Sequence, residues 1–187
     1  MKNIKIIIFL VLLSSGLFAK NMYVGIGMMG GSGKQTLKYD GNTYKADYDT
    51  SASSFKFGFI LRNQNRIEFS VNKFDITCKD SSWTDTYTGY DINYLWTFLN
   101  RDQIQPYIGL GFGLYTSDNM YGQNIKTGDI ENASALALVL SGGVLFNIEE
   151  HIELEVNFNY HNLTWNYEDF DLSDDISTIY VGVNYKF

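Results

Sequence analysis

Alternation of apolar and polar side chains with a period of two residues governs what this 187-residue chain can form. The clearest case is the segment in which Ile152, Leu154 and Val156 alternate with Glu153 and Glu155. Eight such segments lie at about 22–31, 53–62, 66–76, 87–98, 104–115, 134–146, 152–161 and 176–187. The chain holds a single proline, which suits a protein made almost entirely of strands. We therefore expect an all-β fold in which each strand has one apolar and one polar face.

The connections between these segments alternate in length. Residues 63–65, 99–103 and 147–151 are short connections, whereas 32–52, 77–86, 116–133 and 164–175 are longer. Barrels that cross the outer membrane have an even number of strands, with short periplasmic turns and longer external loops. Segments of this length also match the roughly 9–11 residues that a tilted strand needs to cross the hydrocarbon layer. The pattern predicts an eight-stranded antiparallel up-and-down transmembrane β-barrel with both chain ends in the periplasm.

The start of the chain has the composition of a secretory signal peptide. A short basic stretch, Met1 to Lys5, precedes the apolar run Ile6 to Leu13, and Ala19 offers a cleavage position. We expect residues 1–19 to be removed and residues 20–187 to form one barrel domain. The sole cysteine, Cys78, lies far from the cleavage position, so we expect neither a lipoprotein anchor nor an internal disulfide.

The charge of the mature domain argues against binding to nucleic acids. Removing Lys2 and Lys5 leaves 12 of the 14 basic residues against 21 acidic residues, which gives a formal charge of 12 − 21 = −9. Such an acidic surface repels phosphate backbones.

Glycines on the polar faces indicate which face points into the barrel. Gly109, Gly111 and Gly113 alternate with apolar residues, and six further glycines lie on the corresponding faces of other strands. Eight strands leave an interior just wide enough to be filled by side chains, where small residues make room for large ones. The apolar faces are therefore predicted to meet lipid. A soluble lipocalin-like carrier, with its apolar face inside, is the alternative.

Charged residues of the polar faces are predicted to form a network in the lumen. Its expected members are Lys56, Arg62, Arg66, Glu68, Asp91, Glu153, Glu155 and Lys186. Buried charges must be paired, because an unpaired charge costs several kcal/mol in a medium of low dielectric constant. We expect salt bridges that fill and stabilise the barrel. An exchange of partners that opens a narrow ion path is the functional alternative.

The signal peptide, the eight alternating strands and the ending Tyr185-Lys186-Phe187 resemble the small outer-membrane barrels similar to the OmpA transmembrane domain and the OmpX/Ail group. The resemblance covers the whole mature chain and rests on architecture. It implies that Tyr185 and Phe187 form the terminal signal that the barrel-assembly machinery recognises. The peptidoglycan-binding domain of OmpA-type proteins is not expected here.

Aromatic residues near strand ends are predicted to form two girdles at the membrane surfaces. Trp96, Phe98 and Phe146 are expected at the periplasmic side together with the terminal aromatics, and Phe74, Tyr90, Trp165 and Tyr167 at the outer side.

No motif predicts catalysis or a cofactor. His161-Asn-Leu-Thr164 lacks the His-x-Ser arrangement of lipid A deacylases, so an enzyme that modifies lipid A is the least favoured alternative. Gly27 to Thr36 lacks the spacing of a phosphate-binding loop, and the acidic stretch 168–175 lacks the order of an EF-hand, so we expect no metal site.

The expected function is that of a monomeric outer-membrane protein with a structural or adhesin-like role. Its expected partners are outer-membrane lipid, lipopolysaccharide and the assembly machinery, with a host or cell-surface ligand bound through the loops.

Overall fold

The computed structural model describes residues 21–80, 83–98, 103–123, 130–166 and 171–187. Eight strands account for nearly all of them: β1 (Met22–Tyr39), β2 (Asn42–Ile60), β3 (Arg66–Cys78), β4 (Thr84–Thr97), β5 (Ile104–Gln123), β6 (Ile130–Asn147), β7 (Ile152–Trp165) and β8 (Asp171–Lys186). Within this part of the chain, no helix is long and apolar enough to cross a membrane.

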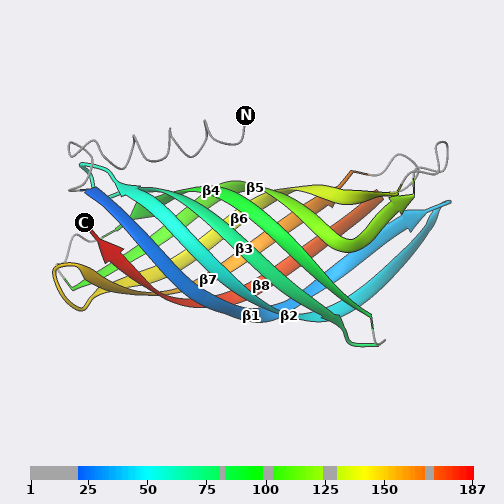
Figure 1. Ribbon diagram of the computed structural model, residues 1–187, viewed down its shortest axis with the longest axis horizontal. Helices are drawn as coiled ribbons and strands as arrows, with labels where there is room; N and C mark the ends of the chain where they lie inside the picture. Colours follow the sequence, from blue (N-terminus) through cyan, green and yellow to red (C-terminus); the bar gives the residue numbers. More distant parts are fainter. Residues whose placement is uncertain (1–20, 81–82, 99–102, 124–129, 167–170) are drawn as a thin grey trace.

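The strands close into one antiparallel barrel in which each strand pairs with the next (Figure 1). β1 and β8 complete the ring over a long register that runs from Tyr23 opposite Lys186 to Lys38 opposite Asp171. Closure leaves no open sheet edge along this register, which is what a sheet surrounded by lipid requires. The predicted fold class and strand number are confirmed.

The outer surface changes from apolar to polar along every strand. On β1 the outward side chains Ile26 and Met28 are 64% and 75% exposed, and Ser32 and Lys34 follow them on the same face. We call the exposed apolar ring the apolar belt. It comprises Ile26, Met28, Phe55, Phe69, Val71, Tyr90, Ile92, Trp96, Ile108, Leu110, Phe112, Leu114, Leu136, Leu138, Leu140, Val156, Phe158, Ile179, Val181, Val183 and Tyr185.

The strands continue well past the belt, away from the chain termini, and we call this part the distal extension. It comprises β1 from Met29, β2 to Ala52, β3 from Asn72, β4 to Gly89, β5 from Tyr115, β6 to Ala135, β7 from His161 and β8 to Thr178. Among the side chains that the structure describes, its outward residues are mostly polar. Its interior is mainly a hydrophobic core that holds Met29, Tyr48, Ala52, Phe74, Ile76, Tyr87, Tyr115, Ala133, Ala135, Leu163, Trp165, Leu172 and Ile176, with a few buried polar side chains such as Asp85 and Asp174. Here the barrel has the apolar interior and polar exterior of a water-soluble protein.

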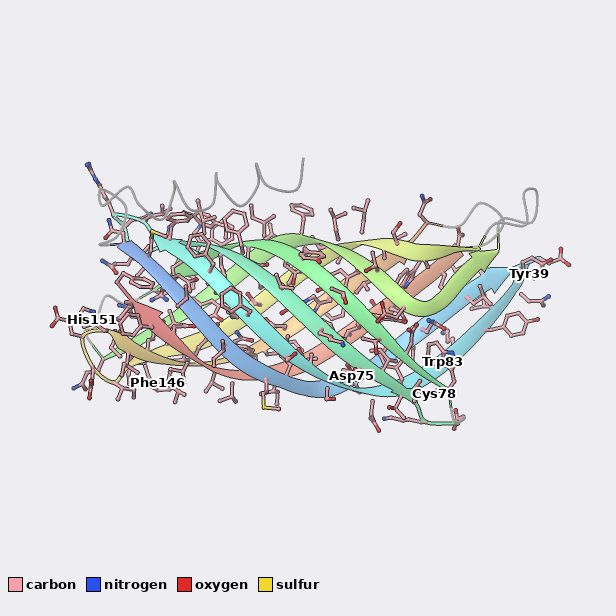
Figure 2. All side chains as sticks on the ribbon, in the orientation of Figure 1. Tyr39, Asp75, Cys78, Trp83, Phe146 and His151 are labelled. Atoms are coloured by element: carbon pink, nitrogen blue, oxygen red, sulfur yellow. The ribbon has the colours of Figure 1, made fainter. Side chains whose placement is uncertain are left out.

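The distal extension corrects the predicted loops. Residues 32–52 form no loop, because β1 and β2 pair until Tyr39 lies opposite Asn42. Asp40 and Gly41 make the two-residue turn with φ values of 46° and 73°, the left-handed conformation that a type I′ hairpin requires (Figures 1 and 2). Much of the stretches 116–133 and 164–175 is likewise strand. Where the side chains are described, the period of two continues, but the polar residues have moved to the outer face; a register shift interrupts the β5–β6 pairing between Thr116 and Tyr121.

Because the polar and apolar faces are exchanged in the distal extension, two residues predicted for the outer girdle lie in the core instead. Phe74 and Trp165 are buried inside the distal extension, so their assignment to the outer girdle was wrong. Trp96, Phe98 and Tyr90 are exposed on the outer surface, and Phe146 is partly exposed at the end where the C-terminus lies (Figure 2). Tyr167 lies outside the described residues.

Replacing Phe74 by alanine tests the core of the distal extension. We expect Phe74→Ala to lower the free energy of unfolding by about 3–5 kcal/mol, because it empties a fully buried site. Phe69→Ala is the matched control, since Phe69 is on the same strand but is 42% exposed in the apolar belt. Urea unfolding of the reconstituted barrel measures both, and equal losses would contradict the presence of a packed distal core.

Candidate functional site: the barrel interior

An ion network fills the lumen within the apolar belt. The Nζ atom of Lys56 on β2 lies 2.9 Å from Glu155 Oε1 on β7 and 3.2 Å from Glu68 Oε1 on β3. The same ammonium group lies 4.0 Å from the centroid of the Tyr180 ring on β8. Lys56 therefore bridges strands on opposite sides of the barrel, and all of its neighbours favour its charged form.

A second ion pair lies closer to the chain termini. Arg66 on β3 donates from Nη1 and Nη2 to the two carboxylate oxygens of Glu153, each at 2.7 Å, in the two-point geometry that an arginine and a carboxylate favour. The Asn184 amide donates to Glu153 at 3.0 Å and to Glu155 at 3.1 Å, which joins the two ion pairs. Lys186, only partly buried, lies 4.0 Å from Glu153 and donates to Asn147. Three cations thus face three carboxylates.

Tyrosine hydroxyls complete the hydrogen bonding of the carboxylates. Tyr23 donates to Glu68 at 2.8 Å, and Tyr107 donates to Glu155 at 2.5 Å. A carboxylate can accept several hydrogen bonds, and each bond made inside the protein offsets part of the hydration lost on burial.

Glycines provide the space for these rings. A Cβ added at Gly58 would collide with the ring of Tyr23, and one added at Gly89 would collide with the ring of Tyr115. The glycines therefore allow bulky inward side chains to cross a narrow barrel.

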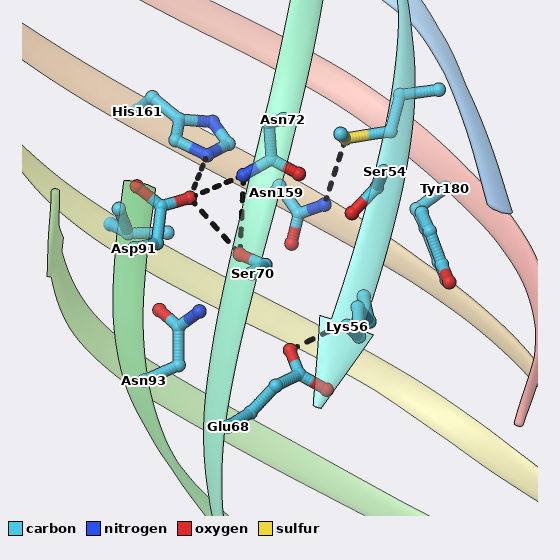
Figure 3. Close-up of a pocket in the computed structure, with 12 residues that line it drawn as sticks. Ser54, Lys56, Glu68, Ser70, Asn72, Asp91, Asn93, Asn159, His161 and Tyr180 are labelled. Carbon is cyan, nitrogen blue, oxygen red and sulfur yellow. Dashed lines mark hydrogen bonds and ion pairs between the residues drawn. The ribbon is translucent and has the colours of Figure 1, made fainter. Parts of the chain in front are cut away.

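Asp91 on β4 is the centre of a separate group in mid-barrel (Figure 3). Its Oδ2 accepts from Asn72 at 2.6 Å, from Tyr115 at 3.1 Å and from Ser70 at 3.4 Å. His161 Nε2 lies 3.6 Å from the same oxygen.

A cavity of about 20 Å³ separates this group from Lys56 and Glu68. Its wall includes Ser54 Oγ, Asn93 Oδ1 and the Tyr180 hydroxyl, buried atoms that make no hydrogen bond within the described part of the chain. A polar space of this size holds one water molecule.

Asp174 on β8 lies in the core of the distal extension, beyond the apolar belt. Its Oδ2 accepts from Trp165 Nε1 at 2.5 Å and from the Tyr87 hydroxyl at 3.4 Å. Burial raises the pKa of the Asp174 carboxyl from 3.8 to about 6, and the hydrogen bond from Trp165 opposes the rise. No cation forms an ion pair with it among the described residues.

The structure brings most of the predicted lumen charges together, with one exception. Lys56, Arg66, Glu68, Asp91, Glu153 and Glu155 are buried inside, and Lys186 lies at the edge of the group. Arg62 is exposed, because β2 ends at Ile60 and the turn that follows carries Arg62 away from the lumen. The alternation of the strand therefore does not extend to this residue.

Sequence reasoning did not identify the uncharged partners in the lumen or the buried carboxylate Asp174. Tyr23, Tyr107, Asn157 and Asn184 lie in the lumen, and Asp174 lies in the distal core. Each lies on the inward face of its strand, so an extension of the alternation would have found the first four. Asp174 lay in a segment predicted to be a loop.

The terminal aromatics lie on the outer surface. Tyr185 and Phe187 are 47% and 50% exposed, and their rings meet edge to face at 5.2 Å. The Phe187 amide donates to Met22 O at 2.9 Å, which fixes the last residue against β1. Recognition of this pair during assembly stays a prediction.

The residues that the structure describes contain no group of three His, Cys, Asp or Glu side chains arranged to hold a metal ion. Part of the acidic stretch at 168–175 lies outside the described residues.

Replacing Lys56 by methionine tests the ion network. The change removes a buried cation from two buried carboxylates, and we expect the free energy of unfolding to fall by about 3–5 kcal/mol. Lys73→Met, at an exposed position, should change it by no more than about 0.5 kcal/mol. Adding Glu68→Gln to Lys56→Met should restore part of the loss in urea unfolding, and no restoration would contradict the assigned pairing.

Asp174 predicts a pH dependence of stability. Because its pKa is higher in the folded protein, stability falls as pH rises from about 3.8 to about 6 and stays low above that range. The difference of about 2 pKa units corresponds to roughly 3 kcal/mol. Asp174→Asn should remove this contribution and stabilise the barrel at pH 7. Unfolding at pH 4 and pH 7 measures the effect, and an unchanged pH dependence in Asp174→Asn would show that another group causes it.

Comparisons with known proteins agree with this geometry. The model of the outer membrane protein beta-barrel domain family matches residues 18–187. A comparison with curated protein sequences finds no significant match.

Solved structures show the same fold at low sequence identity. Neisserial surface protein A (NspA) has a TM-score of 0.60 and 14% identity over 89% of this chain and 97% of its own. OprG from Pseudomonas aeruginosa has a TM-score of 0.55 and 15% identity over 90% and 96% of the two chains. Ail from Yersinia pestis, in a phospholipid bilayer nanodisc, has a TM-score of 0.54 and 18% identity over 90% and 99%.

The family match covers nearly the whole chain, and the apolar belt is the surface that such a barrel presents to lipid. The chain belongs to the outer membrane protein β-barrel domain family and is located in the outer membrane.

Proposed function

We propose that this protein acts at the cell surface as a binding protein, with the closed barrel as its base and the distal extension as its binding part. The observation that carries this proposal is the reversal of polarity along the strands. Both described ends of the barrel lie at one side, and the strands extend past the belt at the other, so we assign the distal extension to the extracellular side. A rigid structure with its own core therefore stands outside the membrane.

The filled interior supports binding over transport. Side chains of the ion network cross the lumen, and the hydrophobic core closes the barrel above it. The larger of these obstacles to ions is the core, because its apolar side chains offer no substitute for hydration.

The β1–β2 hairpin is the most suitable contact surface. Tyr39 and Tyr44 are 54% and 57% exposed at its tip, and Lys38 and Lys45 are exposed beside them. Tyrosine is enriched at protein interfaces because its ring combines apolar area with a hydroxyl group.

The backbone of the hairpin tip adds a second means of recognition. The pairing of β2 with β3 ends at Tyr48 opposite Cys78, and Lys79 N donates to Asp47 O. Beyond that point, no described residue pairs with β2 on this side. Residues 42–46 therefore present an edge to which an extended segment of a partner protein can add as a strand.

The double substitution Tyr39→Ser/Tyr44→Ser tests the proposal. We expect binding of cells that display the protein to host cells or extracellular matrix to fall at least about tenfold, since central aromatic contacts each contribute at least about 1–2 kcal/mol. Insertion into the outer membrane should not change. Ile148→Ser, which removes an exposed apolar side chain from a periplasmic turn, is the control. Equal binding by all three proteins would contradict a role for the hairpin.

A narrow gated ion path is the second candidate, because Lys56 has two carboxylates within reach and could exchange between them. Because the hydrophobic core also blocks the lumen, we expect that this exchange of partners alone does not open an ion path. In planar-bilayer recordings we expect no unit conductance from the natural protein, from Glu68→Ala or from Lys186→Ala. Channel openings in either variant would favour the ion path.

The remaining assignments belong to the same proposal. The barrel acts as a monomer without enzymatic activity, meets lipopolysaccharide at its outer surface, and follows a cleaved signal peptide at 1–19. Tyr185 and Phe187 present the terminal strand to the assembly machinery.

A further inference from the structure

The belt contains a groove that the proposed function does not use. It has a volume of about 570 Å³ and lies on the outer surface of β3, β4 and β5. Its walls are the outward side chains Ile67, Ile92, Tyr94, Trp96, Leu110 and Phe112, and Asn93 and Gly111 contribute to its lining. The volume falls within the roughly 300–1,000 Å³ typical of sites for small ligands, and apolar walls suit a hydrocarbon chain.

Polar groups meet the groove at its periplasmic end. The Tyr94 and Trp96 rings pack edge to face at 4.6 Å, and Asn65 Nδ2 donates to the Tyr94 hydroxyl at 2.8 Å. Asn65 Oδ1 also accepts from Thr97 N at 3.2 Å, so the turn between β2 and β3 is fixed against β4. Amphipathic tyrosine and tryptophan side chains lie at the headgroup level of a membrane.

The same turn carries Arg62. Leu61 N donates to Asn65 O at 2.8 Å, which folds the turn tightly and keeps Arg62 close to the anchored Asn65. Arg62 is exposed and forms no ion pair with another residue that the structure describes. A guanidinium group in this place can bind a phosphate with two hydrogen bonds.

We propose that this groove is a binding site for one anionic phospholipid of the periplasmic leaflet, with an acyl chain along β3–β5 and the headgroup phosphate on Arg62. The apolar walls and the exposed cation match the two parts of such a lipid. The mature chain is acidic overall, and Arg62 is the one Lys or Arg among the described residues of the turns at this end of the barrel.

Quenching of Trp96 by brominated lipids tests the site. Trp83 lies at the distal end and Trp165 is buried inside the barrel, so a bromine on an acyl chain reaches Trp96 alone (Figure 2). The natural protein is reconstituted in vesicles of unlabelled phosphatidylcholine that contain either brominated phosphatidylglycerol or brominated phosphatidylcholine. We expect about fivefold preference for phosphatidylglycerol, the size expected for one basic side chain at an anionic surface.

Arg62→Gln should reduce this preference to near one, whereas Lys79→Gln, which removes a cation at the opposite end of the barrel, should leave it unchanged. Soluble glycerol 3-phosphate should not displace the lipid, because it has no acyl chain to fill the groove. Equal quenching by the two lipids in the natural protein would overturn the proposal and show ordinary lipid contact. An unchanged preference in Arg62→Gln, or full displacement by glycerol 3-phosphate, would also overturn it.

Discussion

Every strand of this barrel passes through two solvents, and the rest of the structure follows from that constraint. Within the belt, lipid outside requires apolar side chains to point outward, and the polar side chains must then be satisfied inside. Past the belt, water outside allows polar residues to face outward, and the interior becomes a hydrophobic core. Val71 and Phe74 show the change on one strand: Val71 is 42% exposed, and Phe74, three residues later, is fully buried. Where the strand pairing is regular, the period of two continues and the polarity of the two faces is exchanged; a register shift interrupts the pairing between Thr116 and Tyr121.

The two interiors hold the barrel together by different means. In the belt, ion pairs such as Arg66–Glu153 join strands that are far apart in the sequence. Tyrosine hydroxyls donate further hydrogen bonds to the buried carboxylates. Removal of one partner leaves a charge that the interior cannot hydrate. In the distal extension, packing dominates, and the buried Asp174 accepts from Trp165 and Tyr87 and forms no ion pair with another described residue. The first interior is filled by polar side chains that bond to one another, and the second is filled mainly by packed apolar side chains.

Alternation was enough to predict the strand number, the fold class and most of the inward charges, because a strand places every second residue on one face. The prediction from alternation failed where the polar and apolar residues exchange faces. Residues 32–52 hold lysines and aspartates on the outer face and small or aromatic residues on the inner one, which resembled a polar loop. Trp165 and Phe74 were assigned outward on their residue type, although the parity of their strands directs them inward. Asn184 lies opposite Glu153 on the neighbouring strand, where alternation and strand order could have placed it. Tyr107 bonds to Glu155 two strands away, and the order along the chain alone does not give that pairing.

Arg62 and Arg66 show how the turn between β2 and β3 changes the burial of neighbouring side chains. They have the same parity and are four residues apart, yet Arg66 is buried against Glu153 and Arg62 is exposed. Within the ion network, Lys56, Arg66 and Lys186 already face Glu68, Glu153 and Glu155, and Asp91 lies in a separate group. Inside this network the Arg62 guanidinium would have no fourth carboxylate to pair with, and an unpaired buried charge costs several kcal/mol. The early end of β2 at Ile60 removes it from the lumen and leaves its charge beside lipid, where an anionic headgroup can neutralise it.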